Sequence, residues 1–156
     1  MLAAAAVLWF IADASFERLA VSPPGVQNGA AAHAGLEITQ TLNRERGLVL
    51  SIAGRAGAAY VDAWQPLFEG AAEVAWHETI GVHAGARHDD RLRREGALAD
   101  FRDPTGRLFF GASVMPFHRR FVAAGATFDY ERAMPGAGRL PSGTRITAVV
   151  RFRGRG

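Results

Sequence analysis

A histidine followed by two carboxylates stands at the start of a long polar segment and is the sharpest catalytic candidate in the chain. The residues are His88, Asp89 and Asp90. An imidazole beside carboxylates can activate water for hydrolysis, and Ser113 is a candidate nucleophile for such a base. Adjacent strand residues point to opposite faces, however, and the sequence places no second group beside His88. We therefore expect a solvated loop start here, with a surface hydrolase as an alternative.

Other catalytic and ligand-binding patterns are missing from the sequence. It has no G-x-S-x-G, no H-E-x-x-H and no glycine-rich phosphate loop ahead of a helix. His77 and Glu78 have no second histidine four residues on, and the chain has no cysteine. The net charge of +3 comes from scattered arginines, which do not form the basic stripe that nucleic acid requires. We expect no catalytic residues, no metal, no cofactor and no nucleic-acid partner.

Two pairs of opposite charges face each other across a predicted hairpin. If Trp76 opposes Ile80, apolar residues meet apolar residues on one face. The same register forms two charge pairs on the other face, Glu69 with Arg87 and Glu73 with His83. Opposite charges directly across a ladder contribute about 0.2 to 1 kcal/mol each. We interpret both pairs as structural bridges that neutralise an enclosed lumen, with proton conduction or gating by Glu73 and His83 as the alternative.

The elements that position these residues are strands, because alternation with period two recurs after residue 35 and helical periodicity does not. Predicted strands cover residues 36–42, 48–60, 67–76, 79–88, 107–115, 121–131 and 144–153. The connections after residues 42, 76 and 115 are short, whereas 89–106 and 132–143 are long. Short and long connections thus alternate, with one exception: residues 64–66 form a tight link between the strands 48–60 and 67–76, where the alternation calls for a long loop. With 156 residues, of which 49% are hydrophobic, the chain forms a single domain, residues 1–156.

Residues 1–20 have two interpretations. The run from Leu2 to Ala12 has only eleven uncharged residues, too few for a helix that crosses a bilayer. It is either the core of a signal peptide, with Ala12, Asp13 and Ala14 as an A-x-A cleavage pattern, or a first strand. The seven strands predicted so far are an odd number, whereas a closed barrel of antiparallel strands needs an even number. An eighth strand from the first 20 residues, joined to the rest by residues 22–33, would close such a barrel. This parity favours the strand.

The composition of the two strand faces indicates which of them meets lipid. No position on the apolar face is charged, while the other face mixes small residues with charges suited to a narrow lumen. Large aromatic residues lie near the strand ends and predict an aromatic girdle: Phe68, Trp76, Phe110, Phe128, Tyr130 and Phe152. Phe68 and Trp76 are separated by roughly 20 Å of height at a strand tilt near 40°. The apolar face is therefore predicted to face acyl chains.

Segments such as "LFFGASVMPF" and "FVAAGATFDYERA", with short and long connections alternating between them, resemble the small eight-stranded barrels of the outer membrane protein A and opacity-protein type. The resemblance covers residues 36–153. It implies an all-β, antiparallel up-and-down transmembrane barrel in the outer membrane of a Gram-negative bacterium, with outer-membrane lipid and the barrel-assembly machinery as partners. Such barrels usually end on an aromatic residue, whereas Phe152 is followed by Arg153 to Gly156. The chain is alternatively the C-terminal part of a larger barrel.

These observations predict an integral outer-membrane protein without catalytic activity, with a structural or surface-interaction role and a lumen filled by side chains. Eight strands leave an interior that side chains roughly fill, so we expect no open, porin-like pore. The long loops would carry any recognition outside the cell, of a ligand that the sequence does not identify. The alternative from another class is a soluble, lipocalin-like barrel whose apolar face encloses a hydrophobic ligand.

Overall fold

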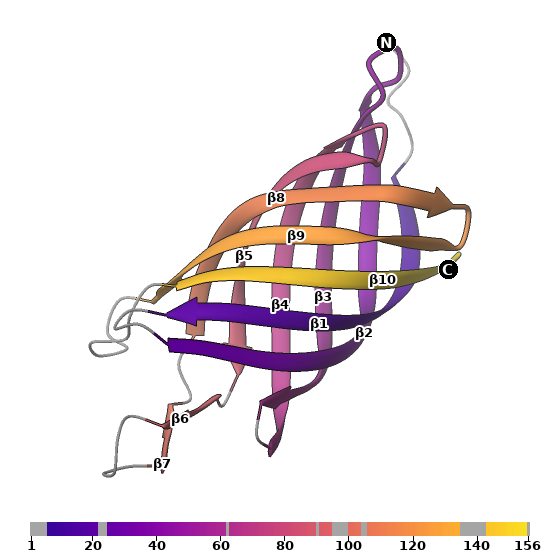
Figure 1. The fold of residues 1–156 in the computed structure, drawn as a ribbon. Coiled ribbons are helices and arrows are strands. Elements are labelled where there is room, and N and C mark those ends of the chain that lie inside the picture. The colour runs from indigo at the N-terminus through magenta and orange to yellow at the C-terminus, as the bar shows by residue number, and fades with distance from the viewer. Residues whose placement is uncertain are drawn as a thin grey trace.

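The computed structural model describes residues 6–21, 25–61, 63–89, 91–94, 100–103, 106–134 and 143–155. Its strands are β1 (Val7–Val21), β2 (Gly25–Asn43), β3 (Leu48–Val61), β4 (Ala63–Trp76), β5 (Ile80–Asp89), β6 (Arg91–Arg94), β7 (Asp100–Asp103), β8 (Gly106–Arg119), β9 (Val122–Ala133) and β10 (Gly143–Arg155). Eight of them close a barrel in the order β1-β10-β9-β8-β5-β4-β3-β2 (Figure 1). All neighbours are antiparallel, so the predicted eight-stranded up-and-down barrel is confirmed.

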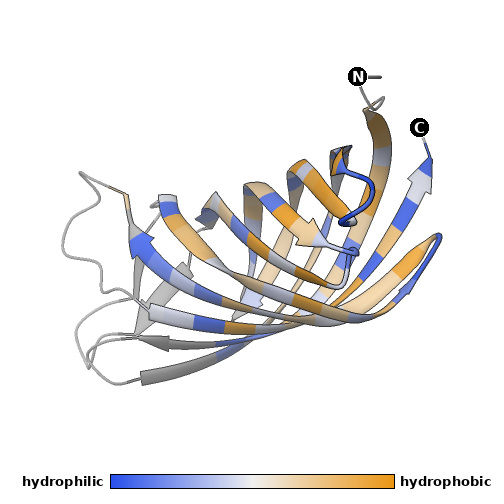
Figure 2. Ribbon diagram, turned by 90° about the horizontal axis from the view of Figure 1, so that it is seen from above, coloured by the Kyte–Doolittle hydropathy of each residue, from blue (hydrophilic) through white to orange (hydrophobic). Residues whose placement is uncertain are grey.

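The connection between β5 and β8 contains β6 and β7, which pair with each other as a separate two-stranded sheet. The connections on the other side of the barrel are short. β1 begins and β10 ends on that short-turn side, where Trp9 opposes Arg155 (Figure 2). No helix in the described ranges is long and apolar enough to cross a membrane.

The N-terminal segment is a strand of the barrel. β1 pairs with β2 on one side and with β10 on the other, so it closes the ring. The predicted connection over residues 22–33 is wrong, because β2 already begins at Gly25 and runs antiparallel to β1 from there. The sequence Gly25 to His33 is poor in β-branched residues, so its local preference for strand is weak. Pairing with the far more apolar β1 imposes the strand on it.

The predicted tight link over residues 64–66 is also wrong. These residues belong to β4, which begins at Ala63 and pairs with β3 up to Val61. Pro66 suggested a break because proline cannot donate to a sheet ladder. Its ladder with β5, however, begins only at Leu67, so Pro66 needs no partner on that side.

The central hairpin has the predicted register. Trp76 opposes Ile80, and the break falls on His77, Glu78 and Thr79. His77 and Glu78 adopt positive φ angles of 50° and 54°, which two-residue hairpin turns require and which glycine or asparagine usually supply. The turn is closed by the Thr79 N–H, which donates to the Trp76 carbonyl at 3.0 Å.

The two faces of the sheet meet different surroundings. Outward side chains are apolar and exposed, as for Phe110 at 61% and Val82 at 64%, whereas inward Arg87 is 1% exposed. The strands accordingly show alternating hydrophobic and hydrophilic residues along their length (Figure 2). A soluble barrel for a hydrophobic ligand requires the opposite arrangement, with the apolar face inside. That alternative is therefore wrong, because the apolar face lies outside and charges fill the interior.

A bulge interrupts the alternation in β8. The register with β9 shifts between Val114 and Phe117, so β8 carries one extra residue at Met115 and Pro116. Proline is tolerated at a bulge because the ladder is already locally broken. Beyond the bulge Phe117, His118 and Arg119 are all exposed, which extends the polar end of β8 at the short-turn side.

Candidate functional site

The lumen is the one place where the structure gathers groups capable of chemistry among the residues it describes. Every barrel strand contributes at least one ionisable side chain to it. The lumen set is Asp13 and Glu17 from β1, His33 and Glu37 from β2, Arg55 from β3, Glu69 and Glu73 from β4, His83 and Arg87 from β5, Arg107 from β8, Asp129 and Glu131 from β9, and Arg145, Arg151 and Arg153 from β10.

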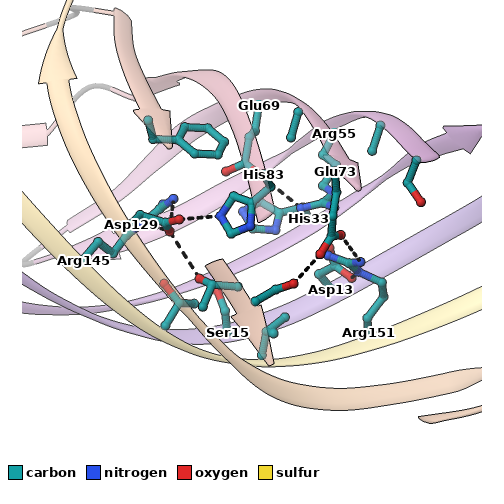
Figure 3. A pocket seen from close by; sticks show the side chains of 18 of the residues that line it. Asp13, Ser15, His33, Arg55, Glu69, Glu73, His83, Asp129, Arg145 and Arg151 are labelled. Carbon is teal, nitrogen blue, oxygen red and sulfur yellow. Dashed lines mark hydrogen bonds and ion pairs between the residues drawn. The ribbon is translucent and has the colours of Figure 1, made fainter. Parts of the chain in front are cut away.

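Asp13 joins two strands that are not its neighbours in the sequence. Its carboxylate accepts from Arg151 Nε at 3.1 Å and lies 3.3 Å from Arg55 Nε. Arg55 in turn pairs with Glu69 at 3.0 Å. Asp13 is 4% exposed, so this ion network is screened little by solvent. The interaction of Asp13 with Arg151 spans the β1–β10 seam (Figure 3).

Glu17 is the second carboxylate of β1 with a bridging role. Arg87 donates to both of its oxygens, at 2.7 and 3.1 Å, in the two-pronged geometry that guanidinium and carboxylate favour. Arg145 lies 3.5 Å from the same carboxylate. Arg145 also pairs with Asp129 and Glu131, each at 3.0 Å. The two arginines and their carboxylates form a dense layer across the half of the lumen nearer the long loops.

Histidine and serine side chains lie nearer the centre. His83 Nε2 lies 2.5 Å from Asp129 Oδ1, a short hydrogen bond, and Ser113 donates to Glu73. Thr127 donates to the other oxygen of Asp129 at 3.2 Å. Figure 3 shows the imidazole of His83 directed at Asp129, and the ring of Phe109 lies edge-on to it with centroids 5.9 Å apart. These groups hold one another in place and face a cavity of the lumen.

The predicted charge pairs are neighbours in the β4–β5 ladder. Glu69 opposes Arg87, and Glu73 opposes His83. The ion-pair geometry gives other partners. Arg55, directly opposite Glu69 in the β3–β4 ladder, pairs with Glu69, while Glu17 pairs with Arg87 and Asp129 with His83 from strands that are not neighbours of β5. The predicted pairs are therefore correct as neighbours in the β4–β5 ladder. These ion pairs are made with other side chains and form a network that spans the barrel.

Asp13 and Glu17 were missed as site residues because the first twenty residues had two interpretations. The signal for them was present in the sequence. Trp9, Ile11, Asp13, Ser15 and Glu17 alternate with apolar Phe10, Ala12, Ala14 and Phe16. Once this segment is a strand, its carboxylates share one face with period two. Their partners, however, come from β3, β5 and β10, and no local pattern indicates such distant contacts.

The lumen encloses a cavity of about 70 Å³ lined by residues of all eight barrel strands. Both ring nitrogens of His33 and the hydroxyl of Thr147 line it without a hydrogen-bond partner in the described part of the chain. Buried polar atoms of this kind are usually satisfied by internal water, and the cavity has room for a few molecules. A second cavity of about 30 Å³ lies towards the short turns and shares Ser51, Glu73, Met115 and Arg151 with the first.

The hydrolase candidates do not form a site. His88 is exposed on the outer face of β5, whereas Ser113 is 2% exposed inside the lumen. The side chain of Asp89, and Asp90 as a whole, lie outside the described residues. Because the sheet separates His88 from Ser113, these two residues cannot act on one substrate. The described residues also contain no group of three potential metal ligands.

The six residues of the predicted aromatic girdle all point outwards. Their exposed fractions run from 39% for Tyr130 to 61% for Phe110. Phe110 and Tyr130 oppose each other in the β8–β9 ladder, with ring centroids 5.4 Å apart. Trp76 adjoins a short turn, and Phe152 lies near the end of β10 on the same side. Their depth in a bilayer stays a prediction.

Comparison with known proteins matches the fold alone. No family model matches the chain, and no curated protein sequence matches it. The N-terminal β-barrel domain of Pseudomonas aeruginosa OprF is similar with a TM-score of 0.52 and 13% identity, over 92% of this chain and 97% of that one. Neisserial surface protein A has a TM-score of 0.45 and 16% identity, over 95% of this chain and 98% of that one. A de novo designed transmembrane barrel has a TM-score of 0.41 and 8% identity, over 92% of this chain and 95% of that one. The likeness to the OprF domain, together with the closed antiparallel ring of eight strands, gives the chain the fold of a small outer-membrane β-barrel.

Proposed function

We propose that this protein is an integral barrel of the bacterial outer membrane with a structural or surface-interaction role and no open pore. The observation that carries the proposal is the inverted distribution of polarity. Large apolar side chains lie exposed around the outside, while charged side chains line the inside, where Arg87, Glu131 and Arg107 are 1, 1 and 9% exposed. In water such an apolar outer surface favours aggregation. In a bilayer the same side chains contact acyl chains, which are equally apolar.

The lumen supports a structural role over transport. Its arginines and carboxylates interlock across the barrel, and the two cavities enclosed between them hold only about 70 and 30 Å³. An eight-stranded barrel has an interior that side chains fill. The charged layer at Glu17, Arg87 and Arg145 lies across the route that a solute would take. Recognition then belongs to the connections between β5 and β8 and between β9 and β10, which we propose face the cell exterior.

Lipid and the barrel-assembly machinery are the partners that this proposal implies. The outward apolar surface requires acyl chains, and an antiparallel closed sheet satisfies every strand edge, as a membrane-spanning sheet must. The seam between β1 and β10 provides that closure with thirteen paired positions from Trp9–Arg155 to Val21–Gly143. The proposal does not assign a specific extracellular ligand.

Refolding into lipid vesicles tests the proposal. The urea-denatured protein should enter phosphatidylcholine vesicles and then float with them after an alkaline carbonate wash. On a gel, the unheated sample should migrate differently from the boiled sample, because a closed barrel resists detergent until heated. Protein that stays in the supernatant as a folded soluble species would contradict the proposal.

A further inference from the structure

The rim of the barrel at the short turns carries an excess of exposed positive charge. We define the short-turn rim by its exposed charged residues and histidines: Arg44, Glu45, Arg46, His77, Glu78, His118, Arg119, Arg120 and Arg155. Glu78 is already paired with Arg153 at 2.8 Å. Glu45 is then the remaining exposed carboxylate of the rim, against five exposed arginines that form no ion pair within the described part of the chain.

Exposed aromatic rings lie at the same end of the barrel as these arginines. Trp76, Phe117, Phe121 and Phe152 are 53, 48, 52 and 53% exposed. The guanidinium of Arg120 lies over the ring of Phe121, 4.9 Å from its centroid. Aromatic residues favour the boundary between acyl chains and headgroups. In the proposed membrane barrel, these rings would hold the neighbouring arginines at the level where a bilayer presents its phosphates.

Backbone hydrogen bonds hold the three turns of the rim together. The His77 N–H donates to the Gly47 carbonyl at 2.8 Å, which joins the second turn to the first. The Met115 N–H donates to the Thr79 carbonyl at 2.6 Å, which joins the second turn to the bulge of β8. Trp76 thus stands between a turn with Arg44 and Arg46 and a turn with Arg119 and Arg120.

We propose that the short-turn rim binds the phosphodiester headgroups of anionic phospholipids in the leaflet that it contacts. Guanidinium groups bind phosphate oxygens through paired hydrogen bonds, and arginines near an anionic leaflet are attracted to it. The rim presents several such groups side by side, above an apolar belt that admits the acyl chains. This inference rests on the proposed function, since the rim meets lipid only if the barrel spans a bilayer.

Quenching of tryptophan fluorescence by brominated lipids measures the preference directly. In a Trp9→Phe/Trp64→Phe background, Trp76 alone reports on lipid at the rim. The protein is refolded into phosphatidylcholine vesicles that contain equal fractions of brominated phosphatidylglycerol or brominated phosphatidylcholine. We expect the relative binding constant for phosphatidylglycerol at Trp76 to be about three- to fivefold above that for phosphatidylcholine at low salt, and to approach one at high salt.

Variants of the rim identify the arginines responsible. Replacing Arg119 and Arg120 by glutamine should reduce the preference, and replacing Arg44 and Arg46 as well should abolish it. Arg132→Gln removes an exposed arginine at the opposite end of β9 and should leave the preference at Trp76 unchanged. The gel shift on heating verifies that every variant has inserted.

Each outcome bears on one claim. Equal quenching by the two lipids in inserted protein overturns the headgroup site and leaves the membrane barrel intact. A preference that survives in the fourfold variant overturns it too, because charge elsewhere is then responsible. Failure of the parent protein to insert into either vesicle overturns the proposed function itself, and the rim site with it.

Discussion

At the scale of single residues, the inside and outside of this barrel impose different rules on the same residue type. Gly85 faces the lumen, and a Cβ added there would lie 2.6 Å from Phe109 Cζ and 3.0 Å from Ala71 Cα. Gly70 sits on the adjacent strand but faces outwards, and an added Cβ would meet nothing within 4 Å. The lumen is packed to contact at Gly85, whereas the outer wall is open at Gly70.

Gly85→Ala and Gly70→Ala form a matched pair that tests this difference. Gly85→Ala should lower the free energy of unfolding by about 1–3 kcal/mol, because overpacking forces backbone and ring to shift. Gly70→Ala should leave it unchanged or raise it by less than about 1 kcal/mol, since alanine restricts the unfolded chain. The midpoint of urea unfolding in vesicles measures both. Equal destabilisation by the two variants would mean that the faces are not distinguished in this way.

The partner of Glu69 can be identified by double-mutant cycles. We expect Glu69 and Arg55, 3.0 Å apart, to be coupled by about 0.5–3 kcal/mol. Coupling of Glu69 to Arg87 should be smaller, because Arg87 donates two hydrogen bonds to Glu17. Removing Arg87 along with Glu69 should therefore destabilise the barrel beyond Glu69→Ala alone. If the Glu69→Ala/Arg87→Ala protein is instead the more stable of the two, the pair predicted from the sequence is the dominant one.

At the scale of elements, the strands with strong alternation could be predicted from the sequence and those with weak alternation could not. β4, β5, β8, β9 and β10 have a regular outward face of uncharged, mostly apolar residues that includes several large ones, and their existence and the register of the central hairpin are confirmed. The first half of β2 is rich in alanine and glycine, so its strand depends on pairing with β1. The bulge of β8 was also not predictable, because it is set by the register with β9.

The lumen network was predictable only in part, for the same reason. Period two identifies which side chains face inwards, and Glu69, Glu73, His83 and Arg87 do face inwards. It does not indicate which charges meet across the lumen, since that depends on the diameter and tilt of the closed barrel. Contacts such as Glu17 with Arg87, seventy positions apart, exist only in the finished ring.

Removal of β1 tests the role of this element. A protein that lacks residues 1–21 should fail to give a heat-sensitive gel shift after refolding. It loses the pairing of two strand edges and the carboxylates of Asp13 and Glu17, and buried arginines that lose their partners are strongly destabilising. Addition of residues 1–21 as a separate peptide should restore the shift in part. A normal gel shift in the shortened protein would support the signal-peptide interpretation of this segment.

At the scale of the whole molecule, the two halves of the lumen differ in their access to solvent. Towards the long loops, inward side chains are almost fully buried, with Leu67 at 0% and Ala59 at 1%. Towards the short turns, inward residues such as Thr39, Val49 and Ala123 are partly exposed. The lumen is therefore more accessible to solvent near the short turns than near the long loops, where the charged layer of Glu17, Arg87 and Arg145 lies.

Cysteine labelling can measure this difference, because the chain has no cysteine of its own. Ala123→Cys and Ala59→Cys both introduce an inward thiol, one in each half of the lumen. The thiol at position 123 should react with a water-soluble maleimide at least tenfold faster than the thiol at position 59. Both should react fully after denaturation, which is the control for reagent and protein quality. Equal rates in the folded barrel would indicate a lumen that water crosses from end to end.

The bridging role of β1 has a consequence for the order of events during assembly. Asp13 on β1 is the acid that pairs with Arg151 on β10, 3.1 Å away across the strand seam that closes the barrel. Until the two strands meet, an open sheet presents an arginine without this counterion at the very edge that must close, and hydrocarbon penalises such a charge heavily. If the barrel spans a bilayer as proposed, we expect ring closure and entry into the hydrocarbon layer to be coupled.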